Sequence, residues 1–373
     1  GNTALEISGG TVTVTGGCFK NNPEEDNNII DLNGGTLILK GGTFINYAGA
    51  VFKTAPADYG SLLGTGYAYA DENGNLMKPT GMRNDIKSFK VVECTDHRPD
   101  ADGRCIYCEE KCVAEVAYGE TVTKYIDLNK AFEAAKANEG AAVKLLDNVT
   151  GGVSSDGSVI LDLNGKTVDK VEITDGKLTV SGSGSIDALN IKNGTLNISD
   201  NGVRISALTA ETDGKAALTA GTFGSIRVSE GRKIAELLAP EYSYRIGDGW
   251  ASIEQRESDS LTGDITVALT PITGFTVTAD SENVIYGYKT APKITAVPVL
   301  ADGKTASYKW YRITGDTAEE ISGAADAEYT VPEDLDKGTY TYRCEVTSDG
   351  YTLSAEAVIT VNEKVIDSNS VEF

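Results

Sequence analysis

The segment SGGTVTVTGGCF (residues 8–19) recurs as NGGTLILKGGTF (33–44), a shift of 25 positions from residue 8 to residue 33. Each copy is a short strand of Thr, Val, Leu and Ile between two Gly-Gly pairs. Glycine reaches backbone conformations that other residues avoid, so the pairs predict tight corners on either side of the strand. Self-similarity at a short fixed period is typical of solenoids. We therefore expect consecutive turns of a right-handed parallel β-helix, with Phe19 stacked on Phe44.

A second array of short strands and turns covers residues 143–230. Its turn dipeptides are spaced irregularly, which argues against a propeller and favours a parallel β-helix. Antiparallel hairpins remain the alternative, because the same dipeptides also form hairpin turns. The dipeptides are Asn164-Gly165, Asp175-Gly176, Asn193-Gly194 and Asp213-Gly214.

The two arrays end alike, since LLGTGYAYADENG (62–74) matches LLAPEYSYRIGDG (237–249). The chain therefore carries two copies of one module, and we interpret the first as lacking its beginning. In the second copy, residues 127–139 form the only convincing helix of the sequence, with Asp127 as N-cap. We expect this helix to close both the open strand edge and the apolar core of the β-helix. Its apolar face consists of Leu128, Ala131, Phe132 and Ala135.

Residues 273–362 show alternating strands typical of an immunoglobulin-like β-sandwich. Trp310 lies where such domains bury a tryptophan, and DKGTYTY (336–342) predicts a tyrosine corner at Tyr340. Tyr342 replaces the usual cysteine. Cys344 has the same strand parity, so we expect a free, buried thiol there.

The segment CTDHRPDADGRCIYCEEKC (94–112) concentrates four of the six cysteines and the only histidine. Two Cys-x-x-Cys/His pairs separated by a turn suit a tetrahedral zinc site. Disulfides, or a degenerate and empty motif, remain the alternatives. Four protein ligands would leave no position for water, so we expect a structural zinc rather than a catalytic one. The predicted ligands are Cys94, His97, Cys105 and Cys108, with Cys112 as the substitute ligand.

Charge and hydropathy narrow the choice of partners. The net charge of −22 opposes binding to nucleic acid, which depends on basic side chains, and opposes binding to anionic membranes. No run approaches the ~18 apolar residues of a membrane helix. We expect no nucleic-acid partner and no membrane insertion.

The pattern Y-x-x-L-x-x-A-x-x-A (125–134), followed by LDLNGKT (161–167) and GGTF-like corners, resembles modular surface proteins of gut and oral Gram-positive bacteria. The resemblance covers about residues 1–270, and the Cys/His segment is similar to short insertions in the same proteins. It implies pectate-lyase-like β-helices in a secreted or cell-surface adhesin or carbohydrate-binding protein.

The sequence thus predicts a mainly β chain of several domains, a monomer that is part of a longer exported protein. The expected boundaries are 1–93 and 113–272 for the two β-helix modules, 94–112 for the Cys/His knuckle, 273–362 for the sandwich and 363–373 for a tail.

We expect a non-catalytic adhesion or stalk protein that binds a glycan or a host glycoprotein. The only histidine is assigned to the knuckle, which removes the usual base for nucleophilic catalysis. A β-helix polysaccharide lyase or glycoside hydrolase is the main alternative, centred on Lys53 and Asp58 in the long loop 45–61. A surface protein that binds host glycoproteins or immunoglobulins is a third hypothesis. The candidate sugar-stacking residues are Tyr67, Tyr69, Tyr242 and Tyr244, for which module packing is the competing interpretation.

Overall fold

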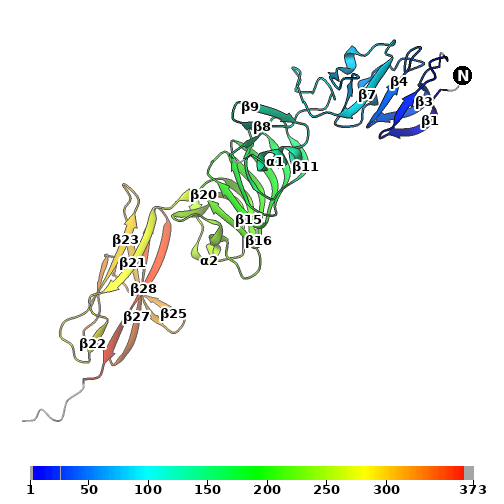
Figure 1. Ribbon diagram of the computed structural model, residues 1–373. Helices are drawn as coiled ribbons and strands as arrows, with labels where there is room; N and C mark the ends of the chain where they lie inside the picture. The colour runs from blue at the N-terminus through cyan, green and yellow to red at the C-terminus, as the bar shows by residue number, and fades with distance from the viewer. Residues whose placement is uncertain (1–2, 26, 139, 365–373) are drawn as a thin grey trace, which may run out of the picture. The chain divides into compact units, whose positions relative to one another are not determined.

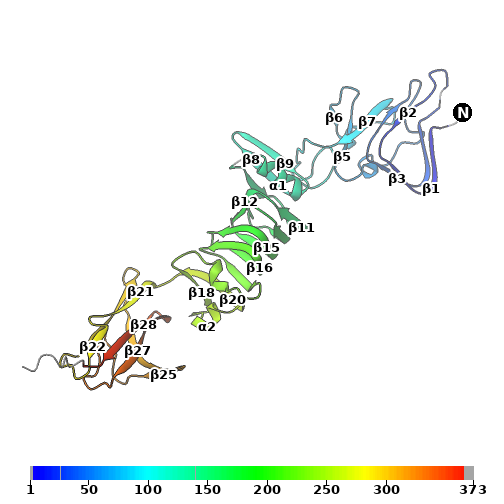
Figure 2. The same ribbon diagram turned by 60° about the horizontal axis from the view of Figure 1, so that its bottom comes forward.

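The structure, a computed structural model, describes residues 3–25, 27–138 and 140–364. The chain divides into two compact units, each described separately here. The first comprises residues up to 172 together with 176–185, and the second comprises 173–175 and the residues from 186 onward. The ribbon is shown in Figure 1 and, turned by 60°, in Figure 2.

The first unit begins with two stacked coils. Strand β1 (Leu5–Val14) pairs in parallel with β3 (Ile30–Leu39), and Thr11 lies opposite Thr36 in the register. The rings of Phe19 and Phe44 stack with their centroids 4.9 Å apart. The repeat of 25 positions is therefore confirmed as one coil of a parallel solenoid.

An asparagine pair joins the same coils on the inside of a corner. Asn21 donates through Nδ2 to Oδ1 of Asn46 at 2.7 Å, and Asn46 donates to the carbonyl of Ala50 at 2.5 Å. Asn46 is only 2% exposed, so these bonds replace the water that its amide group would otherwise contact.

The first module ends in a sheet whose order is β2-β4-β7-β5-β6. Only the β2–β4 pair is parallel, and the remaining pairs are antiparallel. The aromatic rings of Phe44, Phe89 and Tyr69 form its core. The bounds are β2 Cys18–Lys20, β4 Gly42–Ile45, β5 Tyr67–Ala70, β6 Leu76–Met77 and β7 Ser88–Glu93, with the 3-10 helices η1 Gly60–Leu62 and η2 Pro79–Gly81.

The second module opens with the hairpin β8–β9 and helix α1 (Leu128–Lys136). Asp127 caps α1 by accepting a hydrogen bond from the backbone N–H of Asn129, and the four predicted apolar residues of the helix are buried. The predicted range 127–139 was too long, and residue 139 lies outside the described residues.

One detail of the cap was wrong. The open strand edge is covered by β8, which pairs antiparallel with β10, while α1 packs beside β8 and β10–β12. Strands β10, β12 and β14 are parallel to one another, with Ser158 opposite Lys177 in the register. The bounds are β8 Ala114–Tyr118, β9 Thr121–Tyr125, β10 Ala142–Leu145, β11 Val149–Ser155, β12 Ser158–Asp162, β13 Thr167–Ile173 and β14 Lys177–Ser181.

In the second unit, β15 and β16 lie side by side (Figures 1 and 2), and β16 pairs in parallel with β17. The parallel β-helix predicted over 143–230 is thus confirmed within each unit. The order then continues β17-β20-β18-β19, which reproduces β4-β7-β5-β6 of the first module. The bounds are β15 Gly184–Ile198, β16 Val203–Leu218, β17 Thr222–Val228, β18 Tyr242–Ile246, β19 Gly249–Trp250 and β20 Ser260–Leu269, with η3 Ile234–Leu237 and α2 Ile253–Arg256.

The C-terminal sandwich has two sheets, of order β21-β23-β26 and β22-β28-β27-β24-β25. Trp310 is fully buried and donates through Nε1 to the carbonyl of Asp326 at 3.0 Å. The bounds are β21 Ile272–Ala279, β22 Asn283–Ile285, β23 Lys293–Leu300, β24 Ser307–Thr314, β25 Thr317–Glu320, β26 Glu328–Thr330, β27 Gly338–Ser348 and β28 Tyr351–Asn362.

The predicted tyrosine corner and free thiol are both present in this sandwich. Tyr340 donates through its hydroxyl to the carbonyl of Asp336 at 2.8 Å, and Cys344 is buried as a free cysteine. Of the predicted tail, residues 365–373 lie outside the described part of the chain. None of the helices in the described ranges is long and apolar enough to cross a bilayer.

Candidate metal centre

The knuckle folds around one acidic turn. Asp100 accepts hydrogen bonds through Oδ1 from the backbone N–H groups of Asp102 and Arg104, both at 2.9 Å. Isolated β-bridges join Pro99 to Cys105 and Arg104 to Lys111. The turn reverses the chain at PDADG, as the sequence predicts, and so brings the two halves of the motif together.

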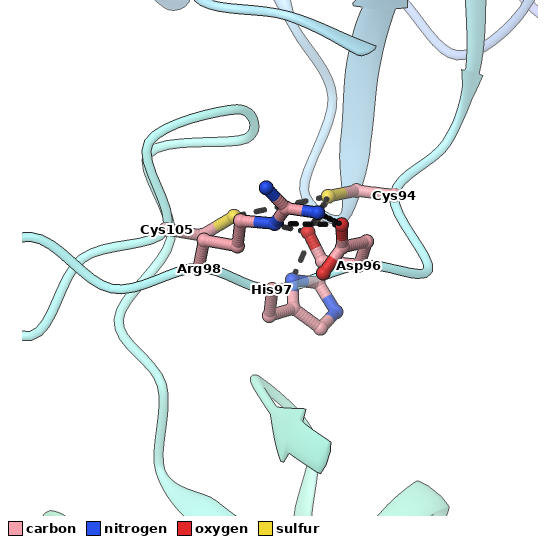
Figure 3. Close-up of polar contacts among 5 residues, drawn as sticks. All are labelled: Cys94, Asp96, His97, Arg98 and Cys105. Atoms are coloured by element: carbon pink, nitrogen blue, oxygen red, sulfur yellow. Dashed lines mark hydrogen bonds and ion pairs between the residues drawn. The ribbon is translucent and has the colours of Figure 1, made fainter. Parts of the chain in front are cut away.

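Four ligand atoms converge in this knuckle (Figure 3). The side chains of Cys94, His97, Cys105 and Cys108 place their ligand atoms within 4.8 Å of one another. The Sγ atoms of Cys94 and Cys105 are 3.8 Å apart, and His97 Nδ1 lies 3.6 Å from the Sγ atoms of both Cys94 and Cys108.

These separations match the edges of a zinc tetrahedron. Bond lengths of about 2.3 Å to sulfur and about 2.0–2.1 Å to nitrogen imply edges of about 3.8 Å between two sulfurs. The same bond lengths imply about 3.6 Å between a sulfur and a nitrogen. The four side chains could therefore hold a metal ion without a change in backbone conformation.

The cysteines of the knuckle are buried, whereas His97 is partly exposed. Ala68 and Leu76 of the first module pack against the cysteines, as do Ile126 and Leu146 of the second. A metal ion at this position would lie within the small apolar core that joins the two modules, and burial would limit its contact with water.

Without a metal, the three thiols compete for protons. Hydrogen bonds from Cys108 and Cys94 lower the pKa of Cys105, which favours its thiolate. The hydrogen bond to Cys105 is the largest cause that raises the pKa of Cys94, and it also raises that of Cys108 to about 12. A divalent cation would remove this competition, because it stabilises all three thiolates together.

Contacts around the four ligands hold the chain in place. The carbonyl of Asp96 lies 3.7 Å from Cys94 Sγ and 3.9 Å from Cys105 Sγ. The carboxylate of Asp96 accepts a hydrogen bond from Arg98 at 2.9 Å, and the guanidinium of Arg98 lies over the ring of Tyr107 (Figure 3). Supporting contacts of this kind orient metal ligands.

Cys112, the predicted substitute ligand, is not one of the four converging residues. Its side chain is buried in the same cluster, and burial raises the pKa of its thiol to about 11. The ligand set of the structure is therefore the primary one that the sequence predicts.

The candidate sugar-stacking tyrosines separate into two pairs. Tyr69 and Tyr244 are fully buried, and their hydroxyls donate to the carbonyls of Tyr59 at 2.9 Å and Ile234 at 2.8 Å. Their rings are therefore unavailable to a sugar, and packing is their role in this structure. Tyr67 and Tyr242 are partly exposed and remain candidates.

The loop residues proposed for a catalytic alternative have other partners. Lys53 forms an ion pair with Asp31, with Nζ and Oδ2 2.5 Å apart, and Asp58 accepts a hydrogen bond from the backbone N–H of Gly60. Asp31 is buried and was not singled out in the sequence. Its strand β3 and the bridge between Ile30 and Phe52 place it beside Lys53, a proximity that needed the coil register.

Residues 274–361 match a family model whose description is that of a PKD domain. The C-terminal sandwich is a PKD domain. The match begins within β21 and ends within β28, so it covers the PKD domain and none of the solenoid. No curated protein and no solved structure matches the chain.

Proposed function

We propose that this chain is part of an extracellular, non-catalytic stalk or adhesion protein whose solenoid modules display a glycan-binding surface. The observation that carries the proposal is the way each module ends. In both copies, the terminal hairpin is packed into the domain that follows, as expected of a protein that transmits force along its length.

In the first copy, Leu76 of β6 packs against the buried cysteines of the knuckle. In the second copy, the matching residue of β19 is Trp250, whose Nε1 donates to the carbonyl of Asp349 in the PKD domain at 3.1 Å. The Trp250 ring meets the Tyr351 ring edge-on at 5.1 Å.

A buried arginine strengthens the second junction. Arg256 is 8% exposed, donates to the carbonyl of Thr352 at 3.2 Å, and places its guanidinium over the ring of Tyr351 at 4.6 Å. Desolvated cation–π contacts are worth about 2 kcal/mol, which favours a stiff joint over a free linker.

We propose zinc as the metal of the knuckle, in a structural role. Three thiolates and one imidazole suit zinc better than hard cations, which prefer oxygen ligands. The Gram-positive surface proteins with pectate-lyase-like β-helices, which the first 270 residues resemble, are the group in which we place the chain.

Two assays on the intact chain test this function. We expect a glycan array to give a signal for at least one glycan, and a reducing-sugar assay on the same polysaccharides to show no release of ends. Saccharide release that is lost in Lys53→Ala or Asp58→Ala would favour the lyase or glycosidase alternative. Binding to host glycoproteins that survives deglycosylation would favour the third hypothesis.

Surface labelling of intact producing cells tests the location. We expect the chain to react with a membrane-impermeant reagent before lysis. Reaction only after lysis would contradict an extracellular role.

A further inference from the structure

The two copies of the module differ on one face of the terminal sheet. Arg245 lies opposite Thr266 in the second copy, where Ala70 lies opposite Lys90 in the first. The strand order is the same in both copies, so the fold accepts alanine at this position. An arginine there is not needed to form the module.

Arg245 lies in a groove of about 690 Å³ in the second unit. The residues of one wall belong to the hairpin β18–β19, those of the other to the solenoid corners at Asn201 and Thr219, and the floor is formed by β20. Tyr242 and Leu269 are cross-strand neighbours at one end of the groove, and Leu269 is 51% exposed.

The guanidinium of Arg245 is held in a fixed position. It donates to the carbonyl of Asp248 at 2.6 Å and lies over the ring of Trp250 at 5.3 Å. A guanidinium has five N–H donors in a planar fork, so these two contacts leave donors for a ligand. The hydroxyl of Thr219 donates to the carbonyl of Ile198 and keeps its lone pairs free to accept.

We propose that this groove binds a neutral pyranose of a glycan, an inference that rests on the proposed function and names its site. Arg245 and Asn201 supply donors, Asp248 and Thr219 supply acceptors, and the ring of Tyr242 with Leu269 supplies an apolar face. Vicinal hydroxyls both donate and accept, and the C–H face of a pyranose packs on aromatic rings.

Charge favours a neutral sugar over an acidic one. Arg245 and Asp248 are the one cation and the one carboxylate among the described residues that line the groove, so their charges offset each other. The chain as a whole carries a net charge of −22, which repels polyanionic glycans.

The test uses the full chain and titration calorimetry. The probes are gluco-, manno- and galacto-configured neutral tetrasaccharides, beside a tetrasaccharide of uronic acids. We expect at least one neutral probe to bind, and the uronate to bind at least fivefold more weakly than that probe.

Two variants and one control assign the site. Arg245→Ala restores the residue type of the first copy, and we expect it to weaken binding at least tenfold. Asn201→Ala removes an exposed amide, and we expect a three- to fivefold loss. Arg204→Ala removes the same charge from the exposed face of β16, and we expect a change of less than twofold. Near-ultraviolet circular dichroism checks that each variant is folded.

Binding that is unchanged in both Arg245→Ala and Asn201→Ala would overturn the groove and leave glycan binding at another surface. Tighter binding of the uronate would overturn the assignment of a neutral ligand. Absence of binding to every tetrasaccharide, with a positive glycan array, would refute the groove alone. A negative array as well would refute the proposed function.

Discussion

Cys94 and Thr270 occupy the same position at the ends of the two modules. The backbone N–H of Cys94 donates to the carbonyl of Gly66 at 2.8 Å, and that of Thr270 donates to the carbonyl of Glu241 at 2.8 Å. Both acceptors have positive φ, 78° at Gly66 and 70° at Glu241. The module thus ends with one backbone geometry, from which the chain continues into the knuckle or into the PKD domain.

Removal of one ligand should abolish tight metal binding. In Cys108→Ser, we expect metal affinity to fall by more than about 100-fold, since loss of a mere supporting contact already costs 10–100-fold. Elemental analysis of protein purified without chelator measures the metal content. Cys112→Ser is the matched control, because Cys112 is buried in the same cluster but is not one of the four converging residues. Retention of metal in Cys108→Ser with loss in Cys112→Ser would show a different ligand set.

The close approach of neighbouring coils should make one glycine irreplaceable. Gly176 and Gly165 both have positive φ, 73° and 76°. A Cβ at Gly176 would lie 2.6 Å from the carbonyl carbon of Gly157, whereas a Cβ at Gly165 meets nothing within 4 Å.

We therefore expect Gly165→Ala to destabilise the solenoid by about 1 kcal/mol, from left-handed strain alone. Gly176→Ala should cost about 2 kcal/mol more, because backbone atoms must also move. Thermal unfolding followed by far-ultraviolet circular dichroism compares them. Equal losses of stability would contradict the close contact between coils.

The buried hydroxyl of Tyr244 should stabilise the second module. Tyr244→Phe leaves the carbonyl of Ile234 without this donor, at an expected cost of about 1–3 kcal/mol. Tyr242→Phe, at a partly exposed ring two residues earlier, is the control and should change stability little. Denaturant unfolding measures both variants, and a neutral Tyr244→Phe would contradict the buried hydrogen bond.

The same tyrosine gives the module a sensitivity to alkali. Burial raises the pKa of Tyr244 above its usual value of 10.0. The unfolded chain loses this proton near pH 10 while the folded one keeps it, so the contribution to stability is present below pH 10 and is lost as the pH rises further. Stability of Tyr244→Phe should therefore fall less steeply above pH 10.

Cys344 should resist modification in the folded chain. Burial raises the pKa of its thiol from 9.0 to about 12, so both the exclusion of reagent and the low thiolate fraction slow its reaction. We expect an aromatic disulfide reagent to label the exposed Cys18 at once, and Cys344 only after unfolding. Peptide mapping of the labelled protein distinguishes the two. The thiol's contribution to stability is present below pH 9 and is lost between pH 9 and about 12.

Features that follow from local spacing could be predicted from the sequence. The stack of Phe19 on Phe44 came from one repeat length, and the tyrosine corner at Tyr340 came from one motif. The four metal ligands lie close together in the chain, so their convergence depends on a single turn at Asp100.

Features that depend on long-range packing could not. The β8–β9 hairpin covers a strand edge that exists only once the solenoid has formed. Tyr67 and Tyr69 share a strand face, yet only Tyr69 lies deep enough for its hydroxyl to reach the carbonyl of Tyr59. Asp31 has an unremarkable sequence context, and its pairing with Lys53 depends on how the coils align.

The short span of the knuckle sets the order in which the parts of the chain can form. Its four ligands lie between positions 94 and 108, so closing the metal-binding loop costs little conformational entropy. The solenoid strands instead pair across coils, as Leu5 does with Ile30, and need longer stretches of chain to be in place. During synthesis or export, a metal ion could therefore fix the end of the first module before any coil of the second has been made.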